Sequence, residues 1–340
     1  MKKTTAKWML AAALLTVIGI VIGFSSFAAA GFDFNILNTK DFTKNSYTLT
    51  ESFNNLSFAT DTADIVFIPT DDGTARVECY EFEDELHDVK IEDGTLKVTK
   101  PENTYLTGII SFTVTSPKIT VFIPKGEFGT LKIETSTGDV CIPADLSFES
   151  IDVLTSTGDC ELYSSSKSYV KCSTDTGDVT VANAKCTVLD VVVSGANVSL
   201  SSITCTGDAT VRITTGDLHV NTVRASSFST FGSAGDAKIE LVTVARGLTV
   251  ERSTGDVELA RCIADSFTVS TTTGDVEFSA CDCAALNVST VTGDVCGSLL
   301  SPKIFSANTK TGDVSIPTGQ LGGLAVINTT TGDIYFEIIN

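Results

Sequence analysis

Carboxylates are the side chains whose spacing in this sequence could support chemistry, because ten aspartates each follow a glycine at a nearly constant interval. If these aspartates stack, their charges repel one another, and a bound cation would relieve that repulsion. Calcium-binding β-rolls use closely spaced G-G-x-G-x-D nonapeptides, which this repeat does not match. We therefore assign the pairs to backbone hydrogen bonding at chain corners and predict no metal or cofactor site. The pairs are Gly138-Asp139, Gly158-Asp159, Gly177-Asp178, Gly216-Asp217, Gly235-Asp236, Gly255-Asp256, Gly274-Asp275, Gly293-Asp294, Gly312-Asp313 and Gly332-Asp333.

Two carboxylates that flank one glycosidic bond could also hydrolyse it. Nothing in the row singles out one pair, and the repeat leaves almost no room for the loops that carry such groups in polysaccharide-degrading β-helices. The only histidines are His87 and His219, and His219 alternates with Leu218 and Val220, so we expect it to point outward. The sequence predicts no catalytic residue and no enzyme, with a carbohydrate-active β-helix as the weakest alternative.

Two further groups of reactive residues have simpler interpretations. The acidic stretch Glu78–Asp93, which contains His87, could dock a cationic partner, but we interpret it as a solvated face. The ten cysteines include no C-x-x-C pair, which argues against a zinc or thioredoxin-like motif. We expect stacked, buried free thiols, and one or two disulfides between rungs remain an alternative.

The elements that position these residues follow from the repeat. Its glycines, with Gly195 included, are 18 to 21 residues apart from Gly138 onward, and only Gly195 is followed by Ala196 instead of Asp. A further Thr-Gly-Asp at residues 206–208 falls outside this series, as a second corner or a chance match. A fixed period near 20 indicates a solenoid. Glycine can take positive φ at a sharp corner, and the aspartate after it can accept a backbone hydrogen bond.

Apolar residues alternate on either side of each corner, in the order Φ-x-Φ-x-T-x-T-G-D-Φ-x-Φ, which predicts strands with one buried face. Both threonines share parity with the apolar residues, so we expect both to point inward. The fold class is thus all-β, a single-stranded β-helix (β-solenoid) of about eleven rungs of roughly 19 residues. Rungs about 4.8 Å apart would make a rod roughly 50 Å long.

We divide the chain into residues 1–30, a signal anchor; 31–130, a β cap region continuous with the solenoid; and 131–340, the solenoid repeats. In the cap region, residues 63–69, 75–80, 95–99 and 118–124 alternate as strands but lack the Thr-Gly-Asp corner. The C-terminal strand at residues 334–338 has no polar cap, and we expect that edge to be covered by a partner or by another copy.

The N-terminus indicates export. Lys2, Lys3 and Lys7 precede an uncharged apolar run of 23 residues, 8–30, which is long enough to cross a bilayer with its start inside the cell. Cleavage after Ala30, which would secrete the protein, is the alternative. The formal net charge of −19 argues against a nucleic-acid partner.

Together these motifs resemble the bacterial "putative adhesin" family of β-strand-repeat envelope proteins, common in Gram-positive bacteria. The resemblance rests on the N-terminal anchor, on Y-T-L-T-E-S-F-N-N-L-S-F-A-T-D-T at 47–62, on A-D-I-V-F-I at 63–68, on D-G-T-L-K-V at 93–98, on I-T-V-F-I-P at 119–124, and on the T-G-D-V repeats. It covers nearly the whole chain and implies a surface location and a β-solenoid, but no catalytic residues.

The expected function is a non-enzymatic cell-surface scaffold that binds an envelope or surface component, either protein or polysaccharide. The alternative is a membrane-tethered ectodomain that senses envelope stress or regulates a membrane partner. An adhesin should work as a soluble ectodomain, whereas a regulator should need the apolar run at residues 8–30.

Overall fold

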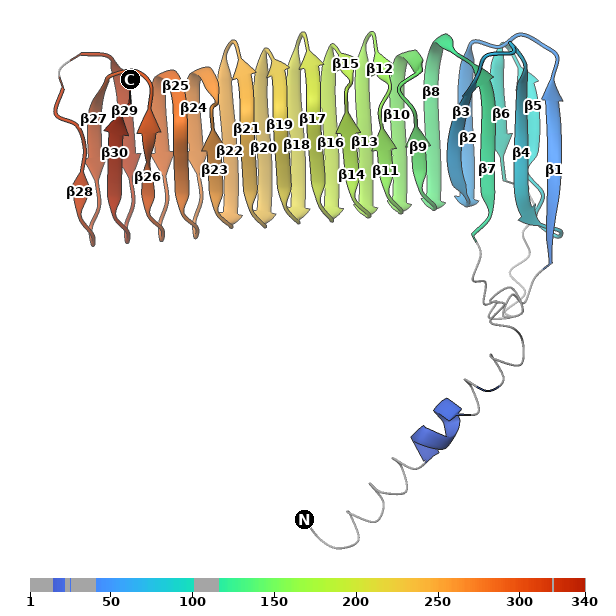
Figure 1. Ribbon diagram of the computed structural model, residues 1–340, viewed down its shortest axis with the longest axis horizontal. Helices are drawn as coiled ribbons and strands as arrows, with labels where there is room; N and C mark the ends of the chain where they lie inside the picture. The colour runs from blue at the N-terminus through green and yellow to red at the C-terminus, as the bar shows by residue number, and fades with distance from the viewer. Residues whose placement is uncertain (1–14, 22–24, 26–40, 101–115, 320, 340) are drawn as a thin grey trace, which may run out of the picture.

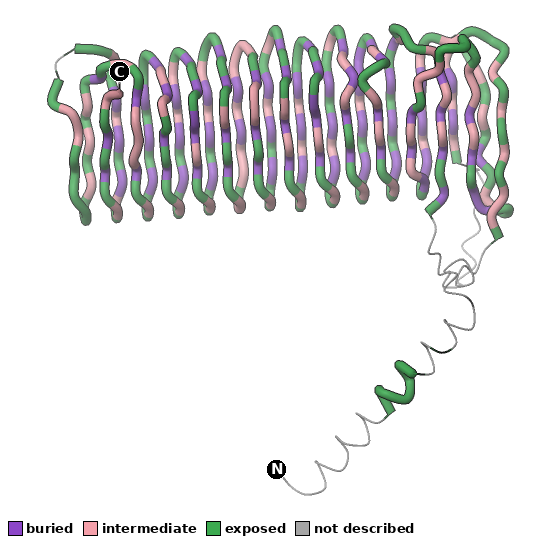
Figure 2. The backbone as a smooth tube through the Cα atoms, viewed as in Figure 1, coloured by how far each residue is buried: buried purple, intermediate pink, exposed green. Residues whose placement is uncertain are grey.

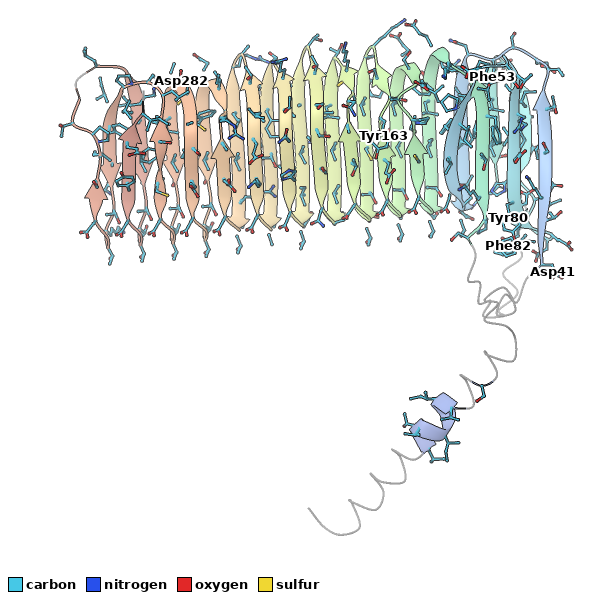
Figure 3. The ribbon with its side chains drawn as sticks, in the orientation of Figure 1. Asp41, Phe53, Tyr80, Phe82, Tyr163 and Asp282 are labelled. Atoms are coloured by element: carbon cyan, nitrogen blue, oxygen red, sulfur yellow. The ribbon has the colours of Figure 1, made fainter. Side chains whose placement is uncertain are left out.

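The computed structural model describes residues 15–21, 25, 41–100, 116–319 and 321–339. The described strands stack into one elongated rod, which confirms the predicted β-solenoid (Figure 1). Each coil runs down one face, turns at a Gly-Asp corner, and returns up the other face. We call the edge that carries these corners the Gly-Asp edge, and the edge where Figure 3 places Phe53 and Asp282 the opposite edge.

Face A is the face that leads into the Gly-Asp corners. Its strands are β2 (Asn55–Thr62), β6 (Thr95–Thr99), β8 (Gly126–Thr137), β10 (Leu146–Thr157), β13 (Tyr169–Thr176), β16 (Val188–Gly195), β18 (Asp208–Thr215), β20 (Ser227–Ala234), β22 (Gly247–Thr254), β24 (Ile263–Ser270), the second half of β25 (Val276–Ser289), β27 (Lys303–Asn308) and β29 (Gly323–Asn328).

Face B leaves the corners and runs back to the opposite edge. Its strands are β3 (Asp64–Thr70), β7 (Lys118–Pro124), β9 (Val140–Ile142), β11 (Cys160–Leu162), β14 (Val179–Ala182), β17 (Val198–Cys205), β19 (Leu218–Ala225), β21 (Ala237–Val244), β23 (Val257–Ala260), the first half of β25, β26 (Val295–Leu299), β28 (Val314–Ser315) and β30 (Ile334–Ile338). Two short strands, β12 (Ser165–Ser166) and β15 (Lys185–Cys186), lie at the opposite edge.

From β8 to β25, successive coils pair in parallel at an offset of 19 or 20 residues, so equivalent side chains stack. For example, Thr155 of β10 lies beside Thr135 of β8 and Thr174 of β13. Inward positions are mostly buried and outward positions are not, as Figure 2 shows along the rod, except in the end coil, where Phe305 and Ala307 are half-buried and Val314 is exposed. Burying one Val, Leu or Ile side chain contributes about 1.5–3 kcal/mol, so the stacked interior holds the rod together.

The threonine expectation was half wrong. The first threonine of T-x-T, as in Thr155 and Thr271, is buried, and its hydroxyl donates to the carbonyl of the second threonine at 3.3 Å. The second, as in Thr157 and Thr273, is exposed. Strand alternation ends there because the chain has begun to turn into the corner.

The N-terminal region closes one end of the rod with antiparallel strands. The predicted strands at 63–69, 75–80, 95–99 and 118–124 correspond to β3, β4 (Ala75–Phe82), β6 and β7. β1 (Phe42–Leu49) pairs with β4, β4 pairs with β7, and β5 (Asp88–Glu92) pairs with β6, all antiparallel. β2 and β3 form a regular coil, because Thr62 lies beside Thr137 at the corner. A corner without glycine thus lies inside the region predicted as the cap.

The C-terminal strand is not the edge of the rod, which corrects our expectation of an uncovered edge there. β30 lies between β26 and β28, and β29 lies between β25 and β27. The last coil of the chain, β29–β30, is therefore inserted between the two coils that precede it in the sequence, and β27–β28 forms the end of the rod. Phe336 packs between Phe278 and Phe305, with ring centroids 5.9 and 5.7 Å apart. This aromatic column favours insertion, because it gives Phe336 a ring on both sides.

The predicted anchor at residues 8–30 lies mostly outside the described residues, of which only 15–21 and 25 belong to it. Among the residues that the structure describes, no helix has the length and apolar character needed to cross a bilayer. All ten cysteines are free, and eight of them are buried. Cys186 and Cys205 stack on adjacent coils with their sulfur atoms 3.2 Å apart.

Candidate binding surface

The Gly-Asp corners form one row of tightly packed backbone. At Gly274, φ is 143°, and a Cβ added there would lie 2.0 Å from the carbonyl oxygen of Gly255 on the next coil. The N–H of Asp275 donates to Oδ1 of Asp256 at 2.8 Å, and Oδ1 of Asp275 in turn accepts from the N–H of Asp294 at 2.8 Å. Nine of the ten aspartates accept a backbone N–H of a neighbouring coil in this way, and among the described residues of the row only Asp313 of the end coil does not.

All ten predicted pairs lie in this row, but its membership differs from the prediction at one coil. Gly195 is not the corner residue there, because Ala196 stacks beneath Gly216 and Asn197 takes the aspartate position. The intervals of 18 and 21 residues thereby become 19 and 20. The row also starts earlier, since Oδ1 of Asp64 accepts from the N–H of Asp139. The extra Thr-Gly-Asp at residues 206–208 lies at the opposite edge, where Gly207 stacks on Thr187.

The row repeats one hydrogen bond, from a backbone N–H to an aspartate Oδ1, and its carboxylates make this edge of the rod anionic. Among the described residues, its carboxylates do not gather in groups of three close enough to hold one metal ion. The binding features of the molecule therefore have to be sought on its faces.

Face A carries a long trough beside the Gly-Asp edge. It consists of three adjoining depressions of about 640, 460 and 520 Å³. Leu154 lines both the first and the second, and Val192 lines both the second and the third. The trough crosses the strands from β2 to β24, which at the usual strand spacing is roughly 40 Å.

The trough combines apolar positions with paired charges. Leu154 is 49% exposed, although it belongs to an outward row that is otherwise mostly polar. Arg212 pairs with Asp190 at 2.7 Å and lies over the ring of Phe231 at 5.9 Å. Lys132 pairs with Glu134 at 2.7 Å, and this hydrogen bond raises the pKa of the lysine. Such a surface offers apolar contact, hydrogen-bond donors and acceptors along one line.

A buried arginine forms part of the wall of the third depression. Arg252 occupies an inward position, is 4% exposed, and extends over Gly232, where any Cβ would collide with its guanidinium. Burial lowers the pKa of Arg252, while the nearby Asp217 and Asp236 act in the opposite direction. Its Nε and Nη1 have no hydrogen-bond partner among the described residues, and Nη2 donates to Thr230 at 3.3 Å.

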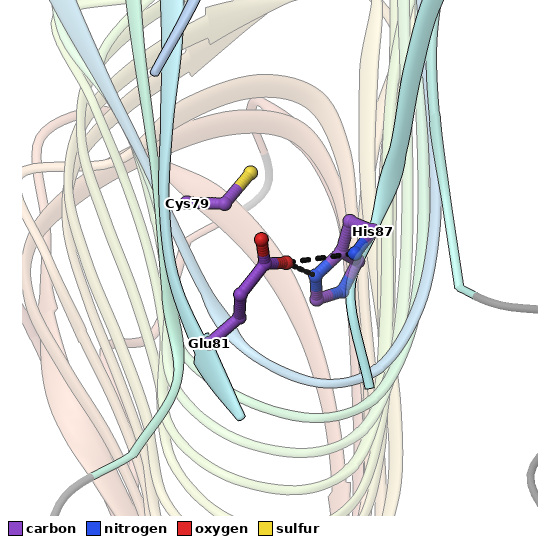
Figure 4. Close-up of side chains that lie close together, drawn as sticks. All are labelled: Cys79, Glu81 and His87. Atoms are coloured by element: carbon purple, nitrogen blue, oxygen red, sulfur yellow. Dashed lines mark hydrogen bonds and ion pairs between the residues drawn. The ribbon is translucent and has the colours of Figure 1, made fainter. Parts of the chain in front are cut away.

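The acidic stretch at residues 78–93 was only partly interpreted correctly. Most of its carboxylates are exposed, but Glu81 is 1% exposed and His87 is 8% exposed. Figure 4 shows Glu81 bonded to His87, with Cys79 beside them. Burial and the Glu81 carboxylate raise the pKa of the Cys79 thiol to about 12. Parity could have revealed this, because Glu81 alternates in step with Val77 and Cys79.

The trough was not predicted, because its residues come from the outward positions of many coils and share no type. His219 does point outward from β19, as its alternation predicted. No predicted site residue lines the trough, because the Gly-Asp pairs lie along the edge beside it.

Stacked corner repeats, a parallel register and two sheet faces around one core define the protein as a β-solenoid. More particularly, the chain belongs to the Toastrack DUF4097 family, which matches residues 53–244 and 227–339. This confirms the family resemblance stated from the sequence. A comparison with curated proteins gave no match.

Several solved structures are similar in fold. A "putative adhesin" from Bacteroides fragilis is 17% identical, with 71% of this chain and 98% of that chain covered and a TM-score of 0.41. A "putative adhesin" from Parabacteroides distasonis is 11% identical, with 75% and 98% covered and a TM-score of 0.48. A "putative lipid binding protein" from the same organism is 13% identical, with 75% and 97% covered and a TM-score of 0.44. At these identities and TM-scores the likenesses carry no functional argument.

Proposed function

We propose that this protein is a non-enzymatic cell-surface scaffold that binds an envelope or surface component along the trough of face A. The partner is a protein or a polysaccharide. Residues 8–30 anchor the chain in the membrane, with the N-terminus inside and the β-solenoid outside. The observation that carries the proposal is the trough itself, whose three depressions share lining residues and together extend from β2 to β24.

The rigidity of the rod supports this proposal. The trough residues project from parallel strands whose other face is packed in the core, so their spacing is set before a partner arrives. A preformed surface loses little entropy on binding. Phe231 and Arg212 are of types that are enriched in protein interfaces relative to the rest of the surface. The open trough suits an extended partner, such as a polymer or a strand of another protein, more than a compact small molecule.

Site-specific photo-crosslinking in intact cells tests the trough. A photoreactive residue replaces Leu154 or Val192 in the trough, and, in matched controls, Glu161 or Ser199 on face B of the same coils. We expect the two trough positions to capture the same component and the face B positions to capture little of it. Equal capture from both faces, or no capture from the trough, would contradict the proposal.

A second comparison separates scaffold from regulator. The anchored chain and a soluble 31–340 chain are crosslinked on cells, and the captured partners are identified by mass spectrometry. Capture of the same surface component by both chains supports the scaffold. If only the anchored chain captures a membrane protein, the result supports the regulatory function and contradicts the scaffold function.

A further inference from the structure

Three side chains with metal-binding atoms converge inside the N-terminal region. Cys79 and Glu81 are neighbouring inward positions of β4, and His87 lies just before β5 (Figure 4). One atom from each, namely the sulfur, a carboxylate oxygen and a ring nitrogen, all lie within 4.8 Å of one another. No other such group of three occurs among the described residues.

The cluster is buried and already preoriented. The two oxygens of Glu81 are both engaged, since Oε2 accepts from the backbone N–H of His87 and contacts its Nδ1, both at 2.7 Å. Oε1 accepts from the side-chain amide of Asn45 at 2.7 Å. The Cys79 sulfur faces this pair but makes no hydrogen bond to any described residue. A buried carboxylate is costly unless it is paired, and a cation bound between Glu81, His87 and Cys79 would pair it.

The donor set selects the kind of ion. Calcium and magnesium take oxygen ligands almost exclusively, whereas zinc accepts thiolate, imidazole and carboxylate together. Zinc–ligand bonds of about 2.0–2.3 Å in a tetrahedron put ligand atoms roughly 3.3–3.7 Å apart. The Nδ1 of His87 and Oε2 of Glu81 are closer than this, at 2.7 Å, whereas the three ligand atoms spread over as much as 4.8 Å. Side-chain shifts of about 1 Å would therefore bring the three atoms to tetrahedral zinc distances.

We infer that Cys79, Glu81 and His87 form a structural zinc site that ties β4 to the segment preceding β5. Binding of Zn²⁺ through Nδ1 of His87 releases the thiol proton of Cys79 to solvent and moves the proton of the Nδ1–Oε2 hydrogen bond to Nε2. A water molecule completes the four ligands. Asn45 supports the site from the outer shell, because it orients the carboxylate. The ion thereby fastens β5 and β4, two of the antiparallel strands that close the end of the rod.

The test uses the purified full-length chain, stripped of metal with a chelator. Zn²⁺ affinity is measured by competition with a chromogenic zinc indicator, and Co²⁺ binding by the near-ultraviolet band of thiolate-to-cobalt charge transfer. Cys79→Ser and His87→Gln remove one ligand each. Cys296→Ser and His219→Gln are matched controls, because Cys296 is a half-buried cysteine outside the cluster and His219 is the only other histidine.

We expect one zinc ion per wild-type chain, a cobalt–thiolate band, and a rise in the thermal midpoint with zinc. Each ligand variant should weaken zinc binding at least about 100-fold, because the loss of even an outer-shell partner typically costs about 10–100-fold, and Cys79→Ser should lose the band. The controls should keep both. No zinc bound by the wild-type chain, or equal binding in His87→Gln and His219→Gln, would overturn the site and leave an ion pair only. If Cys79→Ser fails to fold, His87→Gln decides.

Discussion

The two edges of the solenoid turn the chain in different ways. At the Gly-Asp edge, nine of the ten paired glycines have φ between 130° and 150°, and the tenth, Gly235, has 117°. Near the opposite edge, where face B leads into it, six residues that are not glycine have φ between 51° and 61°, at intervals of 19 or 20 residues. They are Asn183, Ser202, Thr222, Leu241, Arg261 and Ala280.

Backbone contact between coils explains the difference. At the Gly-Asp edge, an added Cβ would lie 2.0–2.2 Å from a carbonyl oxygen of the next coil, so a side chain is excluded. At the opposite edge, left-handed φ costs an L-residue roughly 1–2 kcal/mol, but residues as large as Leu241 and Arg261 are accommodated there. Close contact between the backbones of neighbouring coils thus selects glycine in the sequence, whereas an unfavourable φ alone does not.

The sharpest way to break this comparison is Gly274→Ala. Its Cβ would collide with the Gly255 carbonyl. The alanines that occupy the corner elsewhere, Ala63 and Ala196, do not have positive φ, so an alanine at 274 must change the backbone of its corner. We expect a loss of about 2–4 kcal/mol of unfolding free energy, measured by urea unfolding.

Gly195→Ala is the matched control for that substitution. Gly195 lies one residue before the corner, and its Cβ would lie 3.6 Å from the nearest atom, the Asp175 carbonyl oxygen. The change should cost less than about 0.5 kcal/mol. Similar losses at both positions would contradict the assignment of Ala196 to the corner.

A smaller effect is expected from the aspartate row. Asp275→Ala removes the acceptor for the Asp294 N–H at the exposed edge, and should cost about 1 kcal/mol. Asp275→Asn keeps the acceptor and removes one of the stacked like charges, as Asn197 does naturally. It should stay within about 0.5 kcal/mol of the wild type. Thermal unfolding at low and high salt checks both, and an equal loss in the two variants would contradict the hydrogen-bonding role.

The features of the fold that were predicted from the sequence are those that depend on local contacts. The repeat period, the strand alternation and the Gly-Asp corners come from residues that must be small, polar or apolar at fixed positions. Even there, glycine was a poor guide to register at one coil, because Gly195 lies beside the corner and Asn197 continues the row of acceptors.

The features that escaped prediction depend on distant contacts. Coils 303–319 and 323–338 carry the same pattern, so nothing local sets their order, which follows instead from the packing of Phe336 between two rings. The trough is assembled from outward residues of many coils. Local parity could have revealed the burial of Glu81, but not the hydrogen bond that it accepts from Asn45, 36 residues earlier in the chain.

The opposite edge offers the smallest effect and the finest test of the comparison. Thr222 has φ of 61°, and β-branched residues are strong outliers in this region. Thr222→Gly relieves that strain, loses a hydrogen bond from the Thr222 hydroxyl to Asn221, and adds chain entropy to the unfolded state. We expect a net gain of about 0.5 kcal/mol, read from urea unfolding. Asn183→Gly is its control, because asparagine tolerates left-handed φ well, and it should gain nothing. If Thr222→Gly lost as much unfolding free energy as Gly274→Ala, the backbone at both edges would be set by contact between coils. That result would contradict the proposed difference between the two edges.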